Sequence, residues 1–446
     1  MLRLRWFDRE PTGQPRFVDW RYAALIIATL FLNLHFWLSF GDEFWMSCPI
    51  LPYTFIVAAV AVLTTTLFFV APAAITQATS LPLHRAVENA VGLVPAFCLR
   101  ICTISFLVLW MANSIAVPGL WWVQFILPRA VSTKELWIIV AAIVAFVFFT
   151  GLQSTKTIAK LALFGNKLGI AILLAAIIRV HEGLPEAMNG FPHSDNPLPE
   201  FGRGLSLVMF YAAPLGFLAG NSGCLVQGRK QLAMTAVMGF AAPLFAVLVV
   251  IGVTNVATIK SSFYQASGYP NILMALWGHA AYSSLPGRML IVAITMFGAL
   301  RFGVRSLAES VVPTFPAGIR IPWIRLSGLA LAIAWFSIHQ DHAYLTTALD
   351  ASTACLVCAA AVLSADCLIK AWPTKRTQRI DWVGLTALLA GLGCIPCWNA
   401  ITGAESWSHT WLLPSYATGF LVCLLGRYIQ KKRWATNRDA AVGNIV

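Results

Sequence analysis

Long apolar runs, separated by short polar or basic stretches, fill almost the whole chain. A run of about 20 apolar residues is long enough for an α-helix to cross the hydrocarbon core of a bilayer. Strands of a membrane β-barrel are shorter and alternate apolar with polar residues, so they do not fit the pattern. The runs therefore predict an all-α integral membrane protein with about twelve transmembrane helices. Their centres lie near Ile27, Ala61, Leu107, Ala142, Ile170, Tyr211, Ala246, Ile294, Leu331, Cys355, Leu389 and Leu421.

Composition and charge agree with this interpretation. Hydrophobic residues make up 59% of the 446 residues and charged residues only 11%, whereas a soluble domain is about 25% charged. The net charge of +13 is carried mainly by basic residues between the apolar runs. Charges in these places orient membrane helices and do not form a nucleic-acid-binding surface, so nucleic acid is not an expected partner.

The positions of lysine and arginine predict the orientation of the spans. They are concentrated in the leader at residues 1–20, in the connections after even-numbered spans, and from Arg427 through the basic tail at 430–446. Basic residues mark the cytoplasmic side, so both termini are predicted to be cytoplasmic in a plasma or inner membrane. The tail is expected to contact anionic lipid. The first run has no small-residue cleavage site and is interpreted as a retained span.

Two spans carry helix-breaking or polar residues where a transporter often binds its solute. The first contains "LFLNLHFWLSFG", with Asn33 and His35, and the sixth contains "FYAAPLGFLAGNSG", with Pro214 and Asn221. These two spans are five apart and opposite in predicted direction, as in an inverted repeat of five plus five helices. This predicts one transporter domain. Its parts would be a first repeat at 21–179, a second at 204–369 and two additional C-terminal helices at 380–429. Glycine and proline are also common in ordinary membrane helices.

Polar and aromatic residues within the spans are candidates for substrate binding. Trp110 offers a flat surface, and Asn113 and Ser114 follow at i+3 and i+4 on the same helix face. His35 is able to relay a proton near neutral pH, although a neutral, hydrogen-bonded histidine fits equally well. Tyr211 and Phe217 flank the predicted break in the sixth span; core packing is the alternative for both, as it is for Trp110.

Basic residues inside spans are candidates for a role in ion coupling. The eighth span reads "TMFGALRFGVRSLAES", with Arg301 and, near its cytoplasmic end, Ser306. Lys167 lies well inside the fifth span. A charge inside the bilayer costs at least ~2.5 kcal/mol and often marks a functional site. Arg100 lies nearer the end of the third span, where its side chain is expected to reach the interface.

The stretch "LPLHRAVENAVGLVPAFCLRICTISFLVLW", Leu81–Trp110, resembles the nucleobase:cation symporters, which include purine, cytosine, allantoin and hydantoin permeases. The positions that carry the resemblance are Pro82, Arg85, Val91-Gly92, Arg100 and Trp110. Gly151–Leu173 and Gly220–Val253 are also similar, but the turn after the sixth span reads Asn-Ser-Gly-Cys and lacks the Asp and Arg usual in the family. The chain therefore resembles a divergent member.

This resemblance implies a fold, a mechanism and a class of solute. It implies the five-plus-five inverted repeat, alternating access, and a small planar heterocycle or amide stacked on Trp110. In sodium-coupled members the first and eighth helices form the ion site. Arg301 occupies the corresponding region here, so we expect either sodium-independent transport or an anionic solute. Sodium and proton both remain candidate coupling ions.

Other function classes are less consistent with the residues. A membrane-embedded transferase would need a metal-binding acidic loop, a zinc pair or an activated nucleophile, and the chain has only 18 acidic residues. An amino-acid or other small anionic-solute transporter of the same fold remains an alternative. The pairs Cys355–Cys358 and Cys394–Cys397 are flanked by bilayer-type sequence and are interpreted as unreactive thiols. No cofactor, metal site or catalytic residue is predicted.

Overall fold

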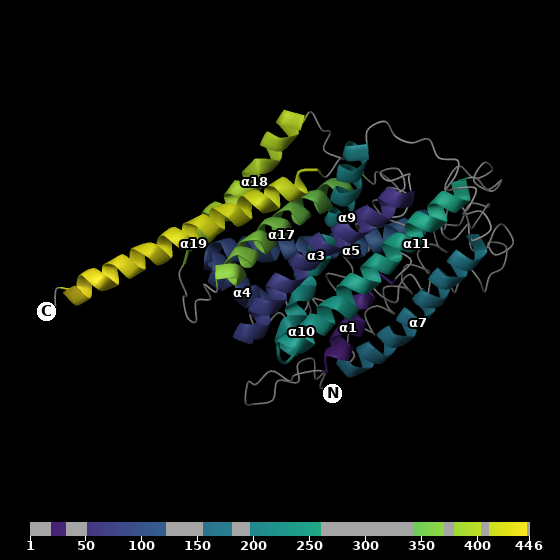
Figure 1. The fold of residues 1–446 in the computed structure, drawn as a ribbon, viewed down its shortest axis with the longest axis horizontal. Helices are drawn as coiled ribbons and strands as arrows, with labels where there is room; N and C mark the ends of the chain where they lie inside the picture. The colour runs from purple at the N-terminus through teal and green to yellow at the C-terminus, as the bar shows by residue number, and fades with distance from the viewer. Residues whose placement is uncertain are drawn as a thin grey trace, which may run out of the picture.

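The computed structural model describes residues 19–32, 51–121, 155–180, 197–259, 343–369, 379–402 and 410–443. In these ranges the regular elements are all helices (Figure 1). They are α1 (Trp20–Ala28), α3 (Leu51–Thr79), α4 (Leu83–Val91), α5 (Leu93–Trp121), α7 (Thr155–Val180), α9 (Pro197–Ala219), the 3-10 helix η3 (Gly220–Leu225), α10 (Arg229–Thr235), the π-helix η4 (Ala236–Ala241), α11 (Ala242–Ile259), α17 (Ala343–Ile369), α18 (Trp382–Thr402) and α19 (Leu412–Gly443).

Seven of the described helical segments are long and apolar enough to cross a membrane, which confirms a multi-pass membrane protein. They coincide with the predicted second, third, sixth, seventh, tenth, eleventh and twelfth spans. The first and fifth predicted spans are represented by α1 and α7. The fourth, eighth and ninth predicted spans lie outside the described residues. The repeat boundaries and the orientation of the termini remain predictions.

The two predicted helix interruptions have different outcomes. Helix α1 ends at Ala28, where the Thr29 hydroxyl donates to the Ile26 carbonyl over 2.6 Å, and a turn follows to Leu32. Asn33 and His35 lie outside the described residues, so the interruption predicted around them remains a prediction. The predicted break at Pro214 is wrong, because α9 continues through this residue to Ala219. A membrane helix tolerates a proline when neighbouring groups satisfy the freed backbone carbonyl.

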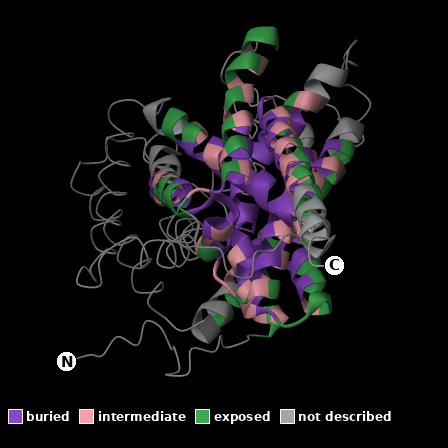
Figure 2. Cartoon of the chain, turned by 90° about the vertical axis from the view of Figure 1, so that its left-hand side faces the viewer, coloured by how far each residue is buried: buried purple, intermediate pink, exposed green. Residues whose placement is uncertain are grey.

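The buried residues gather in the middle of the molecule (Figure 2). Helices α3 and α9 pack against each other and contribute many of these residues. The Thr76 hydroxyl on α3 donates to the Gly220 carbonyl over 2.8 Å, and the Gln77 amide donates to the Gly228 carbonyl over 2.9 Å. A Cβ atom on Gly220 would lie 2.6 Å from Pro72 Cβ. The close approach of the two backbones therefore depends on glycine where α9 tightens into η3.

The π-helix η4 places an aromatic side chain among the neighbouring helices. Phe240 is fully buried; its ring meets that of Phe31 edge-on at 5.0 Å and stacks on that of Phe69 at 5.5 Å between centroids. A Cβ atom on Gly216 of α9 would lie 3.0 Å from this ring. One side chain thus touches the end of the first span, α3 and α9 at once.

A buried arginine joins the C-terminal hairpin, formed by α18 and α19, to the rest of the molecule. Arg427 Nε donates to Asp366 of α17 over 2.8 Å, and Nη1 donates to Asp381 over 2.9 and 3.0 Å. Its Nη2 donates to the Ala90 carbonyl of α4 over 2.9 Å. Asp381 also caps α18 by accepting from the Gly384 amide. The interpretation of Arg427 as an orientation charge is therefore incomplete, since its guanidinium is fixed by partners on three other described elements.

Replacing Gly384 with alanine is expected to lower the stability and yield of the folded protein. The added Cβ would overlap the Ala90 carbonyl oxygen and lie 3.1 Å from Val91 Cα, so α18 would have to move away from α4. Gly393 is the matched control on the same helix, because no atom of another described element lies within 4 Å of its added Cβ. We expect Gly393→Ala to be neutral or slightly stabilising. Melting temperature in detergent measures both effects, and equal values for the two variants would contradict the packing argument.

Candidate functional site

Two of the predicted site residues meet between α5 and α9. The rings of Trp110 and Tyr211 lie 6.4 Å apart at 65°, and Trp110 also stacks on Phe106 at 5.9 Å and 18°. Tyr211 in turn packs edge-on against Phe210 at 5.1 Å. Such rings provide flat apolar surfaces with specific preferred geometries. One aromatic candidate from the third span and one from the sixth are therefore neighbours.

The aromatic pair is closed in this conformation. Trp110 is only 1% exposed and Tyr211 7% exposed. A solute would therefore reach the Trp110 ring only after α5 and α9 separate or their side chains turn. Both residues belong to the buried core, as the core-packing alternative for them expects.

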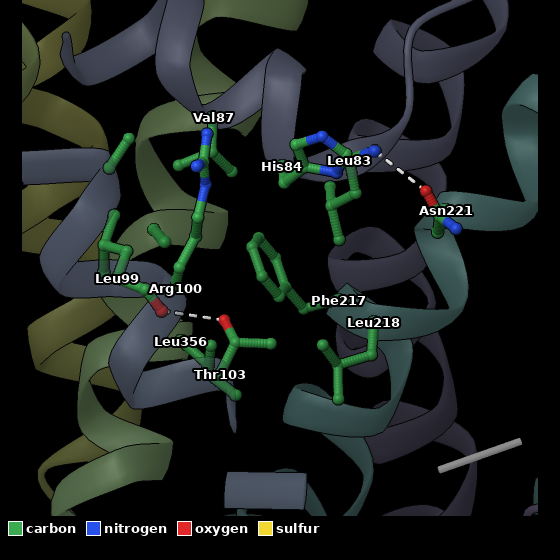
Figure 3. A pocket seen from close by; sticks show the side chains of 12 residues that line it. Leu83, His84, Val87, Leu99, Arg100, Thr103, Phe217, Leu218, Asn221 and Leu356 are labelled. Carbon is green, nitrogen blue, oxygen red and sulfur yellow. Dashed lines mark hydrogen bonds between the residues drawn. The ribbon is translucent and has the colours of Figure 1, made fainter. Parts of the chain in front are cut away.

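A small cavity lies between α4, α5, α9 with η3, and α17 (Figure 3). Arg100 and Thr103 of α5 face Phe217 and Leu218 across it, and His84 lies on the α4 side. The predicted site residues Phe217 and Asn221 both contribute to its wall. The complete lining is Leu83, His84, Val87, Ala96, Leu99, Arg100, Thr103, Phe217, Leu218, Asn221, Leu356 and Ala359.

The hydrogen bonds around the cavity hold its wall together. The Asn221 side-chain carbonyl accepts from the Leu83 amide over 2.8 Å, which joins η3 to the start of α4. The Thr103 hydroxyl donates to the Leu99 carbonyl over 2.8 Å. Asn221 therefore has a positioning role in this conformation, in addition to its predicted place in the site.

Arg100, which lines the cavity, belongs to an ion-pair cluster with two residues of α4 that do not line it. Glu88 is 8% exposed, pairs with Arg85 at 2.7 Å and also pairs with Arg100. The prediction that Arg100 reaches the membrane interface is wrong, because a buried carboxylate from the neighbouring helix holds its guanidinium inside the protein. Sequence reasoning missed Glu88, although the spacing Arg85–Glu88 in an amphipathic segment is a signal for an i,i+3 pair.

The cavity and the aromatic pair lie one above the other between α5 and α9, and this stacked region is called the column below. Thr103 precedes Trp110 by seven residues on α5, which corresponds to about 10 Å along a helix. Phe217 follows Tyr211 by six residues on α9, about 9 Å. Because each helix contributes to both places, α5 and α9 run antiparallel and the cavity lies on the α4 side of the aromatic pair.

Among the remaining predicted residues, Lys167 is fully described and does not line the cavity or contact the aromatic pair. Lys167 is exposed on α7, while its neighbour Asn166 is buried and donates to the Leu25 carbonyl of α1 over 2.9 Å. Asn113 and Ser114 continue α5, but their side chains are not described. Asn33, His35, Arg301 and Ser306 lie outside the described residues. Asn166 was missed, because an amide one residue from a lysine gives no signal of the helix face that it occupies.

Comparison with solved structures identifies the fold. A structure of Mhp1, a nucleobase-cation-symport-1 family transporter in a closed conformation with bromovinylhydantoin bound, superposes with a TM-score of 0.64 over 95% of this chain and 96% of that chain, at 15% identity. This chain has the fold of Mhp1. The all-α multi-span fold predicted from the sequence is thereby confirmed. No family profile matches the sequence, and no curated protein matches it.

Two transporters of other solutes share the same fold at lower similarity. A Na⁺-coupled sialic acid symporter gives a TM-score of 0.53 at 11% identity over 91% of this chain and 88% of that chain. A manganese transporter variant from Eremococcus coleocola gives 0.52 at 13% identity over 93% and 95%. Since the three solutes differ in charge and shape, the solute of this chain has to be inferred from its own residues.

Proposed function

We propose that this protein is a secondary active transporter for a small planar heterocyclic or amide solute, such as a nucleobase, a hydantoin or a related pyrimidine. The observation that carries the proposal is the Trp110–Tyr211 pair between α5 and α9. A fold shared with Mhp1, whose solved structure contains bromovinylhydantoin, supports the same class of solute. Transport would proceed by alternating access, in which the closed aromatic site opens to one side at a time.

The residues around the column favour an uncharged or acceptor-rich solute. A flat ring gains from stacking on Trp110, and no aspartate or glutamate lies among the residues that line the cavity. A cationic solute would need buried carboxylates to replace its hydration. An amino acid or another small anionic solute is the second candidate, favoured by Arg100 in the cavity wall and by the fold shared with a sialic acid symporter.

The coupling ion is proposed to be sodium or a proton. The shared fold of a Na⁺-coupled symporter supports sodium. Arg301 and Ser306 remain the proposed residues in the eighth span. If the Arg301 guanidinium replaces a bound cation there, transport will not require sodium.

Both termini are proposed to lie in the cytoplasm of the plasma or inner membrane. Helix α19 runs beyond the other described helices toward the C-terminus (Figure 1). Lys431 and Lys432 are exposed at the end of its apolar span. This position supports contact with anionic lipid headgroups on the positive-inside side.

Ligand-dependent thermal stabilisation of the purified protein tests the proposed class of solute. We expect nucleobases, hydantoins or pyrimidines to raise the melting temperature, because a ligand that binds only the folded state stabilises it by mass action. Each compound is measured with and without sodium, and amino acids form the comparison set. Stabilisation by amino or carboxylic acids alone would reject the heterocycle class in favour of the second candidate.

A further inference from the structure

The cavity next to the aromatic pair contains a buried donor that lacks an acceptor within the described part of the chain. The Arg100 side chain is 11% exposed, and its Nε is buried with no hydrogen-bond partner among the described groups. Leaving a buried donor unpaired costs about 1–3 kcal/mol, and more for a charged group. An arginine in the wall of a cavity avoids this cost when water or a solute oxygen occupies the cavity.

The charges around the cavity favour an oxygen acceptor over a cation. Glu88 is shared by Arg85 and Arg100, so two guanidinium groups face one carboxylate. His84 adds a further nitrogen-bearing side chain to the same wall (Figure 3). The excess positive charge attracts carbonyl and carboxylate oxygens, and it repels amines and metal ions.

The position of the cavity places it on a route from the aromatic pair toward α4. Phe217 and Leu218 continue the same helix that carries Tyr211, and Arg100 and Thr103 precede Trp110 on α5. In the predicted orientation α4 is cytoplasmic, so a solute that leaves Trp110 toward the cytoplasm passes Arg100. The cavity is small, with room for the edge of a solute and not for a whole ring, until α5 and α9 separate.

We propose that this cavity is a second solute site on the cytoplasmic side, in which Arg100 donates hydrogen bonds to a carbonyl or carboxylate oxygen of the solute. The inference rests on the proposed function and narrows its solute class. Imides, ureides and carboxylates fit the site, whereas amines and divalent metal ions do not. Arg100 thus selects solutes by their acceptor oxygens after they have left the Trp110 ring.

Uptake into proteoliposomes by Arg100→Gln and Arg100→Lys tests the second site. The probes are uracil as a neutral imide and orotate as its carboxylated counterpart, and thermal stabilisation by each probe reports binding. We expect Arg100→Gln to lower the uptake of both probes at least tenfold, with a greater loss for orotate. The rise in melting temperature that uracil causes is expected to change less than twofold. Arg100→Lys keeps the charge and is expected to retain part of the orotate uptake.

The double variant Arg100→Gln with Glu88→Gln separates solute binding from folding. Arg100→Gln alone would leave the buried Glu88 carboxylate with only the exposed Arg85 as its ion-pair partner. The double variant removes this carboxylate, so its folded yield is expected to return to that of the natural protein. Slow uptake by this folded double variant supports the second site. Wild-type uptake of both probes by it, or an unchanged ratio of orotate to uracil uptake, overturns the inference alone. If the natural protein binds neither probe, the inference fails. The proposed function fails as well only if no nucleobase, hydantoin or pyrimidine stabilises the natural protein.

Discussion

We expect that replacing Trp110 with alanine abolishes solute uptake, while the protein still reaches the membrane. The stacking of a planar base on an aromatic side chain is worth about 1–3 kcal/mol, which corresponds to roughly 5- to 150-fold weaker binding. The Trp110 ring also packs between Phe106 and Tyr211, so removing the indole leaves a cavity at the closed site. Uptake of the best stabilising heterocycle into proteoliposomes measures the effect.

Two further variants make this result specific. Trp110→Ala also costs stability, because truncating a buried large aromatic destabilises a protein by about 3–5 kcal/mol. Trp110→Phe fills most of the space and keeps a flat ring, so we expect folded protein with reduced but measurable uptake. Trp382 is 70% exposed on α18 and is the matched control, for which alanine is expected to leave uptake unchanged. Normal uptake by Trp110→Ala would remove the stacking site from the proposed function.

Replacing Arg427 with methionine is expected to give the largest loss of stability of any single change proposed for this protein. The variant leaves Asp366 and Asp381 buried without their common partner, at 5% and 9% side-chain exposure. Removing one member of a buried ion pair typically costs about 3–5 kcal/mol. We therefore expect little folded protein by size-exclusion chromatography. Lys431→Met, four residues further along α19 and exposed, is the control and is expected to fold normally.

A triple variant identifies the cause of that loss. Arg427→Met combined with Asp366→Asn and Asp381→Asn contains no unpaired charge, and asparagine also serves as a helix N-cap in place of Asp381. Replacing a buried ionic network with neutral groups is often nearly neutral for stability, so we expect the triple variant to recover most of its folded yield. A normal yield for Arg427→Met alone would show that the network contributes little.

The sequence predicted the membrane class and the course of most described helices, because bilayer thickness imposes a length on every apolar run. It also predicted that Trp110 and Tyr211 belong to one site, from a resemblance for Trp110 and from the sixth-span break for Tyr211. Their actual contact requires α5 and α9 to be neighbours, which no residue pattern states. Pro214 misled the prediction, since proline removes one hydrogen bond but does not by itself end a membrane helix.

The buried charges could not be assigned from the sequence for a related reason. Arg427 stands at the end of an apolar run, where orientation charges are normally found. Its partners Asp366, Asp381 and Ala90 belong to three other elements, and the pairing depends on their arrangement in space. Arg100 was likewise assigned to the interface because Glu88 lies across the turn at Gly92. In both cases the distance along the helix suggested access to solvent, and a partner from another helix decided otherwise.

The π-helical turn η4 sets the rotation of α11 about the helix axis relative to α10, the other half of the seventh span. Each regular α-helical residue rotates the chain by about 100°, and a π-helical turn holds an additional residue in its wider turn. The faces of α10 and α11 are therefore offset from those of one continuous α-helix. Deleting one residue from Ala236–Ala241 would restore regular α-helical hydrogen bonding. It would also rotate Phe240 about the helix axis relative to Thr235, so the two side chains would no longer face their present neighbours. The number of residues in this segment thus sets which faces of α10 and α11 meet their neighbours.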